Sequence, residues 1–368
     1  MLARIVDDDQ RMFMTGNEVL AWAALAAGAE IMYGYPITPQ NEIMHYWTRL
    51  APRFERGFLQ TEDELSAGFT TLGGVMAGKR AFSATSGPGD ILMQEPICMA
   101  EMMRIPAVWI IQQRGAPSTA TVIYGQQETR LACFGGNGEG HRVVYSTSSH
   151  QELFDYLIKA FNTAWSYRFP TILLGDGYQG KMREAVTLYN PEDHGVKLVP
   201  TEPFVGRPGV PGVDRAPAHY RNTFNIEEEI YEIVHAREEE FEALTPQIVE
   251  FESGYLDEAE MILIGHGIVS RAIKEAVKLL QNKGVKVGYF RPVTLRPFPV
   301  EELRKAVEKV PAVMVFESAL GQLLSMVKEA VGGLPVKIEA FLRPGVGICT
   351  DEAAEQVQEY LRKSSMVH

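Results

Sequence analysis

Apolar residues in the first half of the chain follow two patterns, short continuous runs and longer segments with helical spacing. Between Glu62 and Ala77, apolar side chains recur every three or four residues, which predicts an amphipathic helix. The runs Ala107–Ile111 and Thr171–Leu174 are apolar throughout, which is typical of strands buried on both faces. Together the two patterns predict an α/β fold with a doubly wound parallel sheet that is covered by helices on both sides.

The expected elements of this first unit can be placed by residue number. Helices are expected at 17–27, 41–50, 62–77 and 151–167, and in a segment that ends at 103. Strands are expected at 30–34, 57–60, 81–85, 107–111, 143–145 and 171–174. The residues from 112 to about 142 are largely polar, and a long loop is expected there.

The composition changes after residue 190. A stretch rich in Pro and Gly extends from Asn190 to about Arg221 and predicts a crossing segment or linker. A charged helix is expected at Ile226–Leu244, and a smaller α/β unit begins at Ala259. The expected domains are therefore residues 1–190, 191–255 and 256–368.

The balance of charges narrows the classes of partner. The 368 residues are enough for two domains with cores of their own, and they carry a formal net charge of −12 with no run of Lys and Arg. Phosphate neutralisation needs a basic face, so we expect no nucleic-acid partner. The beginning lacks an apolar core of signal-peptide length, and no stretch is long and apolar enough to span a bilayer. We therefore expect a cytoplasmic protein without a membrane partner.

The cysteines argue against a metal centre on this chain. Cys98, Cys133 and Cys349 are far apart in the sequence, so they build neither a four-cysteine zinc or iron–sulfur site nor a disulfide framework. The eight histidines show no metal-ligand spacing. We expect no metal ligands among the residues of this chain.

Short motifs then connect the chain to a known family. The string Gly34-Tyr-Pro-Ile-Thr-Pro-Gln-Asn-Glu42 follows an expected strand, and it resembles the corresponding loop in alpha subunits of 2-oxoacid:ferredoxin oxidoreductases. Further matches occur in the same order, and the resemblance covers nearly the whole chain. They are Gln60-Thr-Glu-Asp-Glu64, Ala84-Thr-Ser-Gly-Pro-Gly89, Gln113-Arg-Gly-Ala-Pro-Ser-Thr119, Gly138-Glu-Gly-His-Arg142, Leu174-Gly-Asp-Gly-Tyr178 and Phe290-Arg-Pro-Val-Thr-Leu-Arg-Pro-Phe-Pro299.

The resemblance implies a fold and a reaction. It implies a pyrimidine-type thiamine-diphosphate-binding domain, followed by a smaller domain that is similar to the C-terminal domain of transketolase. The implied enzyme converts a 2-oxoacid and coenzyme A to acyl-CoA, carbon dioxide and two electrons. This chain would supply only the pyrimidine half of the cofactor site.

The resemblance also implies partners in a hetero-oligomer. A beta-type subunit would supply the diphosphate half of the site with Mg²⁺ and a 4Fe–4S cluster. A gamma-type subunit and a ferredoxin-like subunit or domain would add coenzyme A contacts and further clusters, and an external ferredoxin or another acceptor would take the electrons.

Glu64 is the residue with the clearest implied role. In the family a glutamate at this place hydrogen-bonds N1′ of the aminopyrimidine, and so routes general acid–base catalysis through the cofactor. Acidic residues in a first helical turn also complement the helix dipole, which Glu62, Asp63 and Glu64 would all do. The flanking motifs favour the catalytic role for Glu64, with Glu62 as the alternative.

The resemblance assigns five more residues to the site. It places the Thr38 hydroxyl beside the reacting carbon and Pro36 against the pyrimidine ring, and it adds Ser86 and Gly87 to the cofactor-binding residues. Arg114 follows an apolar strand at the edge of a parallel sheet where ligands bind, and a guanidinium there suits the carboxylate of a 2-oxoacid. The structural alternatives are a helix cap for Thr38 and a solvent-exposed salt bridge for Arg114.

Three glycine-containing segments resemble ligand-binding motifs less well. Gly175-Asp-Gly177 begins like a diphosphate motif, but no Asn pair follows to complete a metal site, so we expect a tight turn. Gly135-Gly-Asn-Gly-Glu-Gly140 follows no expected strand, which argues against a dinucleotide fingerprint. Gly265-His-Gly267 lies between a strand and a helix, and we interpret it as close strand–helix packing.

The substrate is left open by the sequence. Some motifs resemble branched-chain alpha subunits and others 2-oxoglutarate ones, while the segment Ala120–Arg130 departs from both. A branched-chain or aromatic 2-oxoacid is our first hypothesis, with Tyr35, Trp47 and Tyr124 as possible pocket residues, and 2-oxoglutarate is the alternative. A self-sufficient thiamine enzyme is disfavoured by the missing Asn pair. A non-catalytic scaffold subunit is disfavoured by the presence of Glu64 and Arg114.

Overall fold

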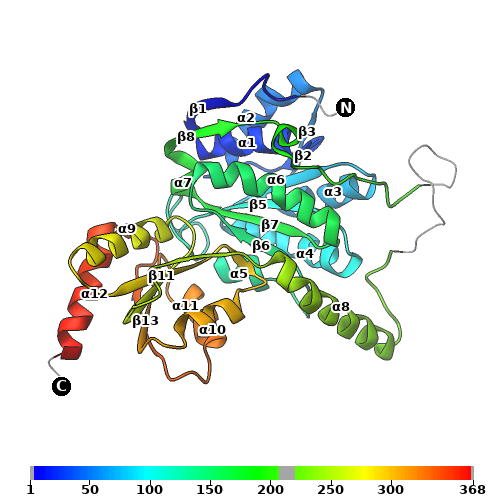
Figure 1. The fold of residues 1–368 in the computed structure, drawn as a ribbon. Coiled ribbons are helices and arrows are strands. Elements are labelled where there is room, and N and C mark those ends of the chain that lie inside the picture. The colour runs from blue at the N-terminus through cyan, green and yellow to red at the C-terminus, as the bar shows by residue number, and fades with distance from the viewer. Residues whose placement is uncertain (1–3, 207–219, 366–368) are drawn as a thin grey trace.

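The computed structural model describes residues 4–206 and 220–365, so the predicted linker prolines at 208, 211 and 217 lie outside the described residues. Three sheets organise the chain (Figure 1). The elements up to residue 188 are β1 (Gln10–Thr15), α1 (Gly16–Ala26), β2 (Ile31–Gly34), α2 (Asn41–Leu50), β3 (Gly57–Gln60), α3 (Glu64–Met76), β4 (Ala81–Thr85), α4 (Pro88–Met103), β5 (Val108–Gln113), α5 (Thr129–Phe134), β6 (Val143–Ser146), α6 (His150–Tyr167), β7 (Thr171–Asp176), α7 (Gly177–Lys181) and β8 (Arg183–Leu188).

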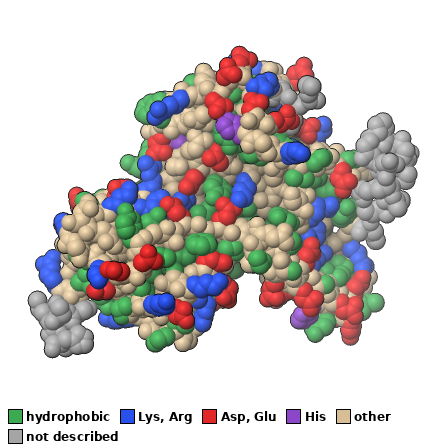
Figure 2. Space-filling view, in the orientation of Figure 1, with side chains coloured by type: hydrophobic (Ala, Val, Ile, Leu, Met, Phe, Trp, Pro, Cys, Tyr) green, Lys and Arg blue, Asp and Glu red, His purple; other side chains and the backbone are tan. Residues whose placement is uncertain are grey.

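The remaining elements form the C-terminal part. Helix α8 (Glu227–Ile248) projects from the lower right of the molecule, where Figure 2 shows a group of acidic side chains. It leads into the C-terminal unit, which comprises β9 (Phe251–Gly254), β10 (Met261–Ile264), α9 (Val269–Asn282), β11 (Val287–Pro292), β12 (Thr294–Arg296), α10 (Val300–Val307), β13 (Ala312–Glu317), α11 (Gln322–Ala330), β14 (Lys337–Leu342) and α12 (Thr350–Ser365).

The large sheet has seven strands in the order β12-β6-β7-β5-β4-β2-β3. All of its strands run parallel except β12, which pairs antiparallel with β6 at the edge. The carboxyl ends of β3, β2, β4 and β5 therefore lie side by side. In parallel sheets this edge is where ligands bind, and the loops that leave these four strands carry the predicted site residues.

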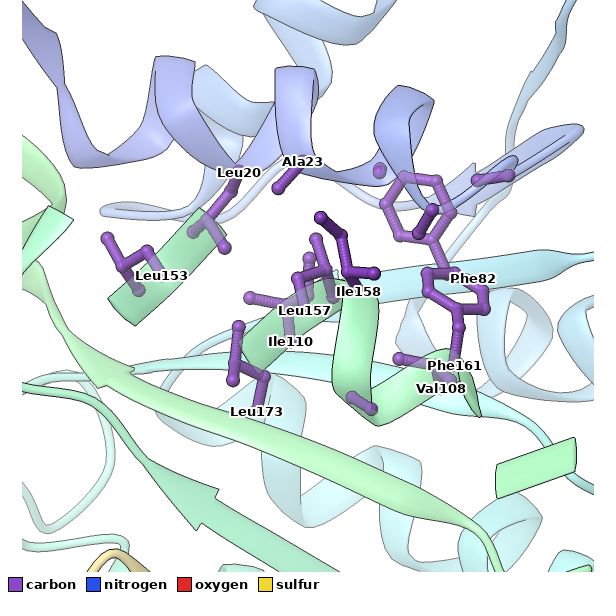
Figure 3. Close-up of a cluster of buried hydrophobic side chains, with 14 of the residues drawn as sticks. Leu20, Ala23, Phe82, Val108, Ile110, Leu153, Leu157, Ile158, Phe161 and Leu173 are labelled. Carbon is purple, nitrogen blue, oxygen red and sulfur yellow. The ribbon is translucent and has the colours of Figure 1, made fainter. Parts of the chain in front are cut away.

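Helices cover both faces of the large sheet, as the sequence predicts. On one face α1 and α6 pack over β4, β5 and β7, and Figure 3 shows their side chains interlocked with those of the strands. The labelled residues of this cluster are Leu20, Ala23, Phe82, Val108, Ile110, Leu153, Leu157, Ile158, Phe161 and Leu173. A second cluster joins α3, α4 and α5 to the other face, and it continues into α10 and α11 of the C-terminal unit.

The C-terminal unit is built on a five-stranded sheet in the order β14-β13-β10-β11-β9, with only β9 antiparallel. Helices α9 and α12 cover one of its faces with a cluster of their own. Because β12 leaves this unit to pair with β6, the two units share backbone hydrogen bonds as well as a core.

The predicted α/β class is confirmed, and so is the charged helix, which is α8. One prediction was wrong, because the expected polar loop after residue 111 contains helix α5. The pattern gave no prediction for β1 and β8, which pair in a two-stranded ladder. Within the described residues, no helix combines the length and the hydrophobicity needed to cross a membrane.

A buried ion pair fastens the C-terminal unit to α6. The Arg291 guanidinium, which is nearly inaccessible, donates to both oxygens of Glu152 at 2.7 and 2.5 Å. Burial by itself would raise the pKa of Glu152, but the hydrogen bonds and the charge of Arg291 bring it below its usual range. A second carboxylate, Glu252, receives another hydrogen bond from the same guanidinium.

We predict that Arg291→Ala lowers the free energy of unfolding by about 3 kcal/mol, because it leaves a largely buried carboxylate without its cation. Urea unfolding of the full chain measures the effect. Lys274→Ala removes only a more exposed partner of Glu252 and should cost less than about 1 kcal/mol. Equal losses in the two variants would contradict a special role for the buried pair.

Candidate functional site

The predicted site residues gather at the carboxyl edge of the large sheet. Glu64 is the first residue of α3, yet its side chain is only 4% exposed. The cap of this helix is Asp63, whose carboxylate accepts the backbone N–H of Ser66 at 2.7 Å. Since Asp63 satisfies the helix end and Glu62 is exposed, Glu64 is not needed as a cap. The buried Glu64 carboxyl group is therefore not the cap of α3.

Electrostatics around Glu64 combine burial with two neighbouring charges. Burial raises the pKa of the Glu64 carboxyl above its ordinary value, the negative charge of Asp63 adds to the increase, and the positive charge of Arg114 opposes it. A raised pKa makes a glutamate side chain better suited to exchange protons with a bound group.

Arg114 follows β5 and is 3% exposed. One of its terminal nitrogens donates to the backbone oxygen of Thr38 at 2.7 Å, so the structure joins these two predicted residues. Within the described residues no carboxylate lies within ion-pair distance of this guanidinium, and its Nε–H has no partner. The solvent-exposed salt bridge considered for Arg114 is therefore wrong.

Two glycines allow the site residues to approach the start of α4. Gly87 has φ +56°, and a Cβ there would lie 2.3 Å from the Arg114 Nε atom. At Gly89 a Cβ would lie 2.5 Å from the Glu64 Oε1 atom. Only glycine leaves both side chains where they are. The start of α4 thus approaches both side chains, Arg114 at Gly87 and Glu64 at Gly89.

The other predicted residues surround this centre. Ser86 is buried, and its hydroxyl has no hydrogen-bond partner among the described residues. Thr38 is half-buried, whereas Pro36 is exposed in the same loop. Helix α2 begins after Gln40 without a side-chain cap, so the capping alternative for Thr38 is wrong.

Two buried carboxyl groups beneath the site were missed by sequence reasoning. Glu128 precedes α5, and its Oε2 atom accepts the backbone N–H of Arg114 at 2.9 Å. Asp90, in the first turn of α4, accepts from the Gln94 amide at 2.8 Å. Burial raises the pKa of both groups, and the charge of Asp90 raises that of Glu128 further. Glu128 falls inside the segment predicted as loop, where its pattern gives no sign of burial.

A buried ion pair between Arg142 and Glu101 contacts Gln94, which is the hydrogen-bond partner of Asp90. The Arg142 guanidinium donates to both oxygens of Glu101 at 2.6 and 2.9 Å, and a third bond at 2.8 Å reaches Gln94. Arg142 ends the Gly138–Arg142 motif, which therefore contributes to the support of α4. The motif itself lies away from the Glu64 carboxylate.

The three glycine-containing segments adopt different local structures. Asp176 ends β7 and caps the short helix α7 through the N–H of Gln179, so the expected tight turn becomes a helix start. Gly135–Gly140 follows α5, which agrees with the absence of a dinucleotide fingerprint. Gly265 confirms close packing, since a Cβ there would lie 2.3 Å from Ile273. No group of three or more candidate metal ligands occurs among the residues that the structure describes.

The proposed pocket role of Trp47 is wrong. Its ring is fully buried in the core, packs edge-on against Phe82 at 5.0 Å, and donates to the backbone oxygen of Gly57. Tyr124 instead lies 5.6 Å from the Tyr178 ring. The sequence around Trp47 does not indicate whether this ring faces the core or a ligand.

Comparison with known proteins places the chain among thiamine-dependent oxidoreductases. Residues 22–252 match the family described as pyruvate flavodoxin/ferredoxin oxidoreductase, thiamine diphosphate-binding, and residues 259–349 match pyruvate:ferredoxin oxidoreductase core domain II. The 2-oxoglutarate synthase subunit KorA of Methanothermobacter marburgensis is 32% identical over 360 residues, which cover 92% of this chain and 95% of that protein.

A second relative carries a different substrate name. The ketoisovalerate oxidoreductase subunit VorB of the same organism is 32% identical over 324 residues, with 88% of this chain and 90% of that protein covered. The solved 2-oxoglutarate:ferredoxin oxidoreductase of Magnetococcus marinus has a TM-score of 0.84 at 24% identity. The match covers 95% of this chain and 65% of that one. At this identity the likeness shows the fold.

We predict that Gly87→Ala destabilises the chain by about 2–4 kcal/mol, since it adds a collision with Arg114 to the strain of a positive φ. Gly138→Ala is the matched control, because Gly138 has φ +74° with nothing within 4 Å of the added Cβ. It should cost about 1 kcal/mol. Denaturant unfolding of both variants gives the comparison, and an equal cost would show that Arg114 is not held against Gly87.

Proposed function

Since the chain belongs to the pyruvate flavodoxin/ferredoxin oxidoreductase family, we propose that it is the alpha-type subunit of a 2-oxoacid:ferredoxin oxidoreductase. In this proposal it contributes the pyrimidine half of a thiamine diphosphate site. Together with partner subunits it catalyses oxidative decarboxylation of a 2-oxoacid in the presence of coenzyme A, giving acyl-CoA and carbon dioxide. The two electrons pass to iron–sulfur clusters.

The observation that carries the proposal is that Glu64 and Arg114 lie at the same edge of the sheet without forming an ion pair with each other. A buried carboxyl group with a raised pKa and a buried guanidinium, which has no ion-pair partner among the described residues, lie at one sheet edge next to Gly89 and Gly87. A carboxyl group is what an aminopyrimidine requires, and a guanidinium is what a 2-oxoacid carboxylate requires. The two groups therefore fit the cofactor and the substrate respectively.

The chain's residues have separate tasks in this site. In the assembled enzyme Glu64 would hold the aminopyrimidine and exchange a proton with it, while Ser86, Gly87 and Pro36 would line the place of the ring. The bound cofactor supplies a carbon nucleophile for the oxo group. Arg114 would bind the substrate carboxylate with its N–H groups. It also donates to the backbone oxygen of Thr38, whose hydroxyl would be available to the substrate.

An exposed apolar collar at the same edge supports a beta-type partner. Its residues share the end of β3 and the first turns of α3 and α4, and each is more than a third exposed. They are Leu59, Leu65, Phe69, Ile91 and Leu92. Apolar groups gathered around a buried catalytic residue are typical of a surface that a partner covers. We propose that this partner brings the diphosphate half of the site with Mg²⁺.

Clusters and coenzyme A contacts belong, in this proposal, to other subunits. The three cysteines are free, one of them buried, one half-buried and one exposed. Gamma-type and ferredoxin-like partners would provide the 4Fe–4S clusters and the coenzyme A site. Free thiols agree with the cytoplasm as the compartment of this assembly.

For the substrate we propose a 2-oxoacid with an apolar side chain, branched or aromatic. The segment between Arg114 and Glu128 contains no Lys or Arg, and it exposes Val122 and Ile123. A Cβ on Gly177 would lie 2.5 Å from the Ile123 backbone oxygen and 2.7 Å from Pro39, so this segment lies beside the Thr38 loop. 2-Oxoglutarate is the second candidate, because relatives with that name are 31–34% identical to this chain, against 30–32% for the ketoisovalerate subunits VorB.

The proposal is tested by purifying the chain in complex with its native partners. We expect a brown complex that reduces a viologen dye when a 2-oxoacid and coenzyme A are both present. A complex that contains cofactor and clusters but reduces no dye with any 2-oxoacid would refute the proposed activity.

We predict that Glu64→Gln in the assembled enzyme lowers kcat by about 10²–10⁴-fold, because the amide cannot exchange a proton with the pyrimidine. The unfolding free energy should change by less than about 1 kcal/mol, since Asp63 still caps the helix. Exchange of the cofactor C2 proton with deuterium locates the defect. Glu62→Gln is the control, and a loss in that variant instead would transfer the role to Glu62.

We predict that Arg114→Ala raises KM for short, branched, aromatic and dicarboxylic 2-oxoacids in parallel. A charge-assisted contact of this kind contributes about 1.5–3 kcal/mol. Arg114→Lys should restore little, because an ammonium lacks the planar pair of donors. Steady-state constants with the four substrates decide the matter. A selective loss of the dicarboxylic substrate would assign Arg114 to the distal acid and make 2-oxoglutarate the first candidate.

A further inference from the structure

The Gly265-His-Gly267 turn of the C-terminal unit contacts the segment that leads into α5. The Gln126 side chain, 1% exposed, donates to the His266 backbone oxygen at 3.0 Å and accepts the Ser318 N–H at 3.0 Å. The Gln126 N–H donates in turn to the Ser318 backbone oxygen at 2.9 Å. Gln126 thus bonds to the loops after β10 and β13 at once.

The turn is shaped for this contact. Gly267 has φ +55°, and a Cβ there would lie 3.0 Å from the Gln126 Nε2 atom. The His266 ring lies between the two units, with Nδ1 2.9 Å from the Ser146 hydroxyl and Nε2 3.3 Å from the Thr129 hydroxyl. Burial, assisted by the charge of Arg291, lowers the pKa of His266 to about 3, so the ring is neutral.

Glu128, two residues after Gln126, contacts Arg114, the arginine proposed to bind the substrate. The Glu128 carboxyl group accepts the N–H of Arg114 at 2.9 Å, and it also faces the N–H of Gly87. Thr129 donates to Gln113 on β5 at 3.1 Å. The position of residues 126–129 therefore fixes the backbone of Arg114 and its neighbour.

We propose that Gln126 and Glu128 are positioning residues, through which the Gly265-His-Gly267 turn sets the geometry of Arg114 and hence the affinity for the 2-oxoacid carboxylate. The inference rests on the proposed function, in which Arg114 binds that carboxylate. It assigns the C-terminal unit a part in substrate binding, although that unit lies apart from the Glu64 side of the site.

The structure separates this role from general stability. Glu64 is held by α3 and the start of α4, and it has no hydrogen bond to residues 126–129 among the described contacts. Loosening residues 126–129 should weaken 2-oxoacid binding and leave proton exchange at the pyrimidine intact. A merely structural role would lower both together.

The test uses the assembled complex with Gln126→Ala, Glu128→Ala and Glu128→Gln. Ser325→Ala is the matched control, because it removes a contact between α5 and α11 on the exposed side of the same helix. Three quantities are measured, namely amide hydrogen exchange in peptides containing Gly87 and Arg114, kcat and KM for 2-oxoacids, and deuterium exchange at the cofactor C2 position.

In both alanine variants we expect faster amide exchange at Gly87 and Arg114, and a KM raised about tenfold, as for a buried donor left without its acceptor. C2 exchange should stay within about twofold of the wild-type rate. Glu128→Gln keeps an acceptor oxygen and should restore KM, and Ser325→Ala should change none of the three.

Unchanged amide exchange, or KM and C2 exchange impaired together, would overturn the proposal. Should an alanine variant not fold, Gln126→Asn, which shortens the side chain but keeps it polar, serves in its place. If the wild-type complex turned over no 2-oxoacid, the proposed function would fail, whereas the amide exchange data would still decide whether these residues position Arg114.

Discussion

A buried guanidinium is tolerable in a protein only where its donors and its charge are satisfied, and Arg114 is the group on which this site depends. Its described contacts supply one backbone acceptor, the oxygen of Thr38, and no carboxylate at ion-pair distance. Gly87 has no Cβ, which leaves room for the Arg114 guanidinium, and the Glu128 carboxyl group accepts the backbone N–H of Arg114. A bound carboxylate would supply the ion-pair partner that the described residues do not provide for Arg114.

This arrangement follows from the order of strands in the sheet. Because β3, β2, β4 and β5 are neighbours, the loops with Glu64, Thr38, Gly87 and Arg114 meet at one edge although 50 residues separate Glu64 from Arg114. The same edge exposes the apolar collar. We thus propose that cofactor, substrate and partner meet at the carboxyl ends of the parallel strands. The C-terminal unit would influence Arg114 through its hydrogen bonds to Gln126.

The sequence was sufficient for the fold class and for most of the elements, because buried strands and amphipathic helices leave periodic patterns. It also identified residues whose loops lie at one edge of the large sheet, namely Glu64, Thr38, Ser86, Gly87 and Arg114. What it missed depends on long-range packing. Gln126 is buried against the C-terminal unit and Glu128 against the backbone of Arg114, and neither contact can be read from the polar pattern before α5. Trp47 was misplaced because helical spacing does not reveal which aromatic ring enters the core.

The central claim is that this chain holds only the pyrimidine half of a shared cofactor site. Calorimetric titration of the purified single chain with thiamine diphosphate and Mg²⁺ tests it most directly, with the chain assembled on its beta-type partner as the comparison. We expect weak binding by the single chain and tight binding by the assembly. Micromolar binding by the single chain, unchanged by the partner, would contradict it.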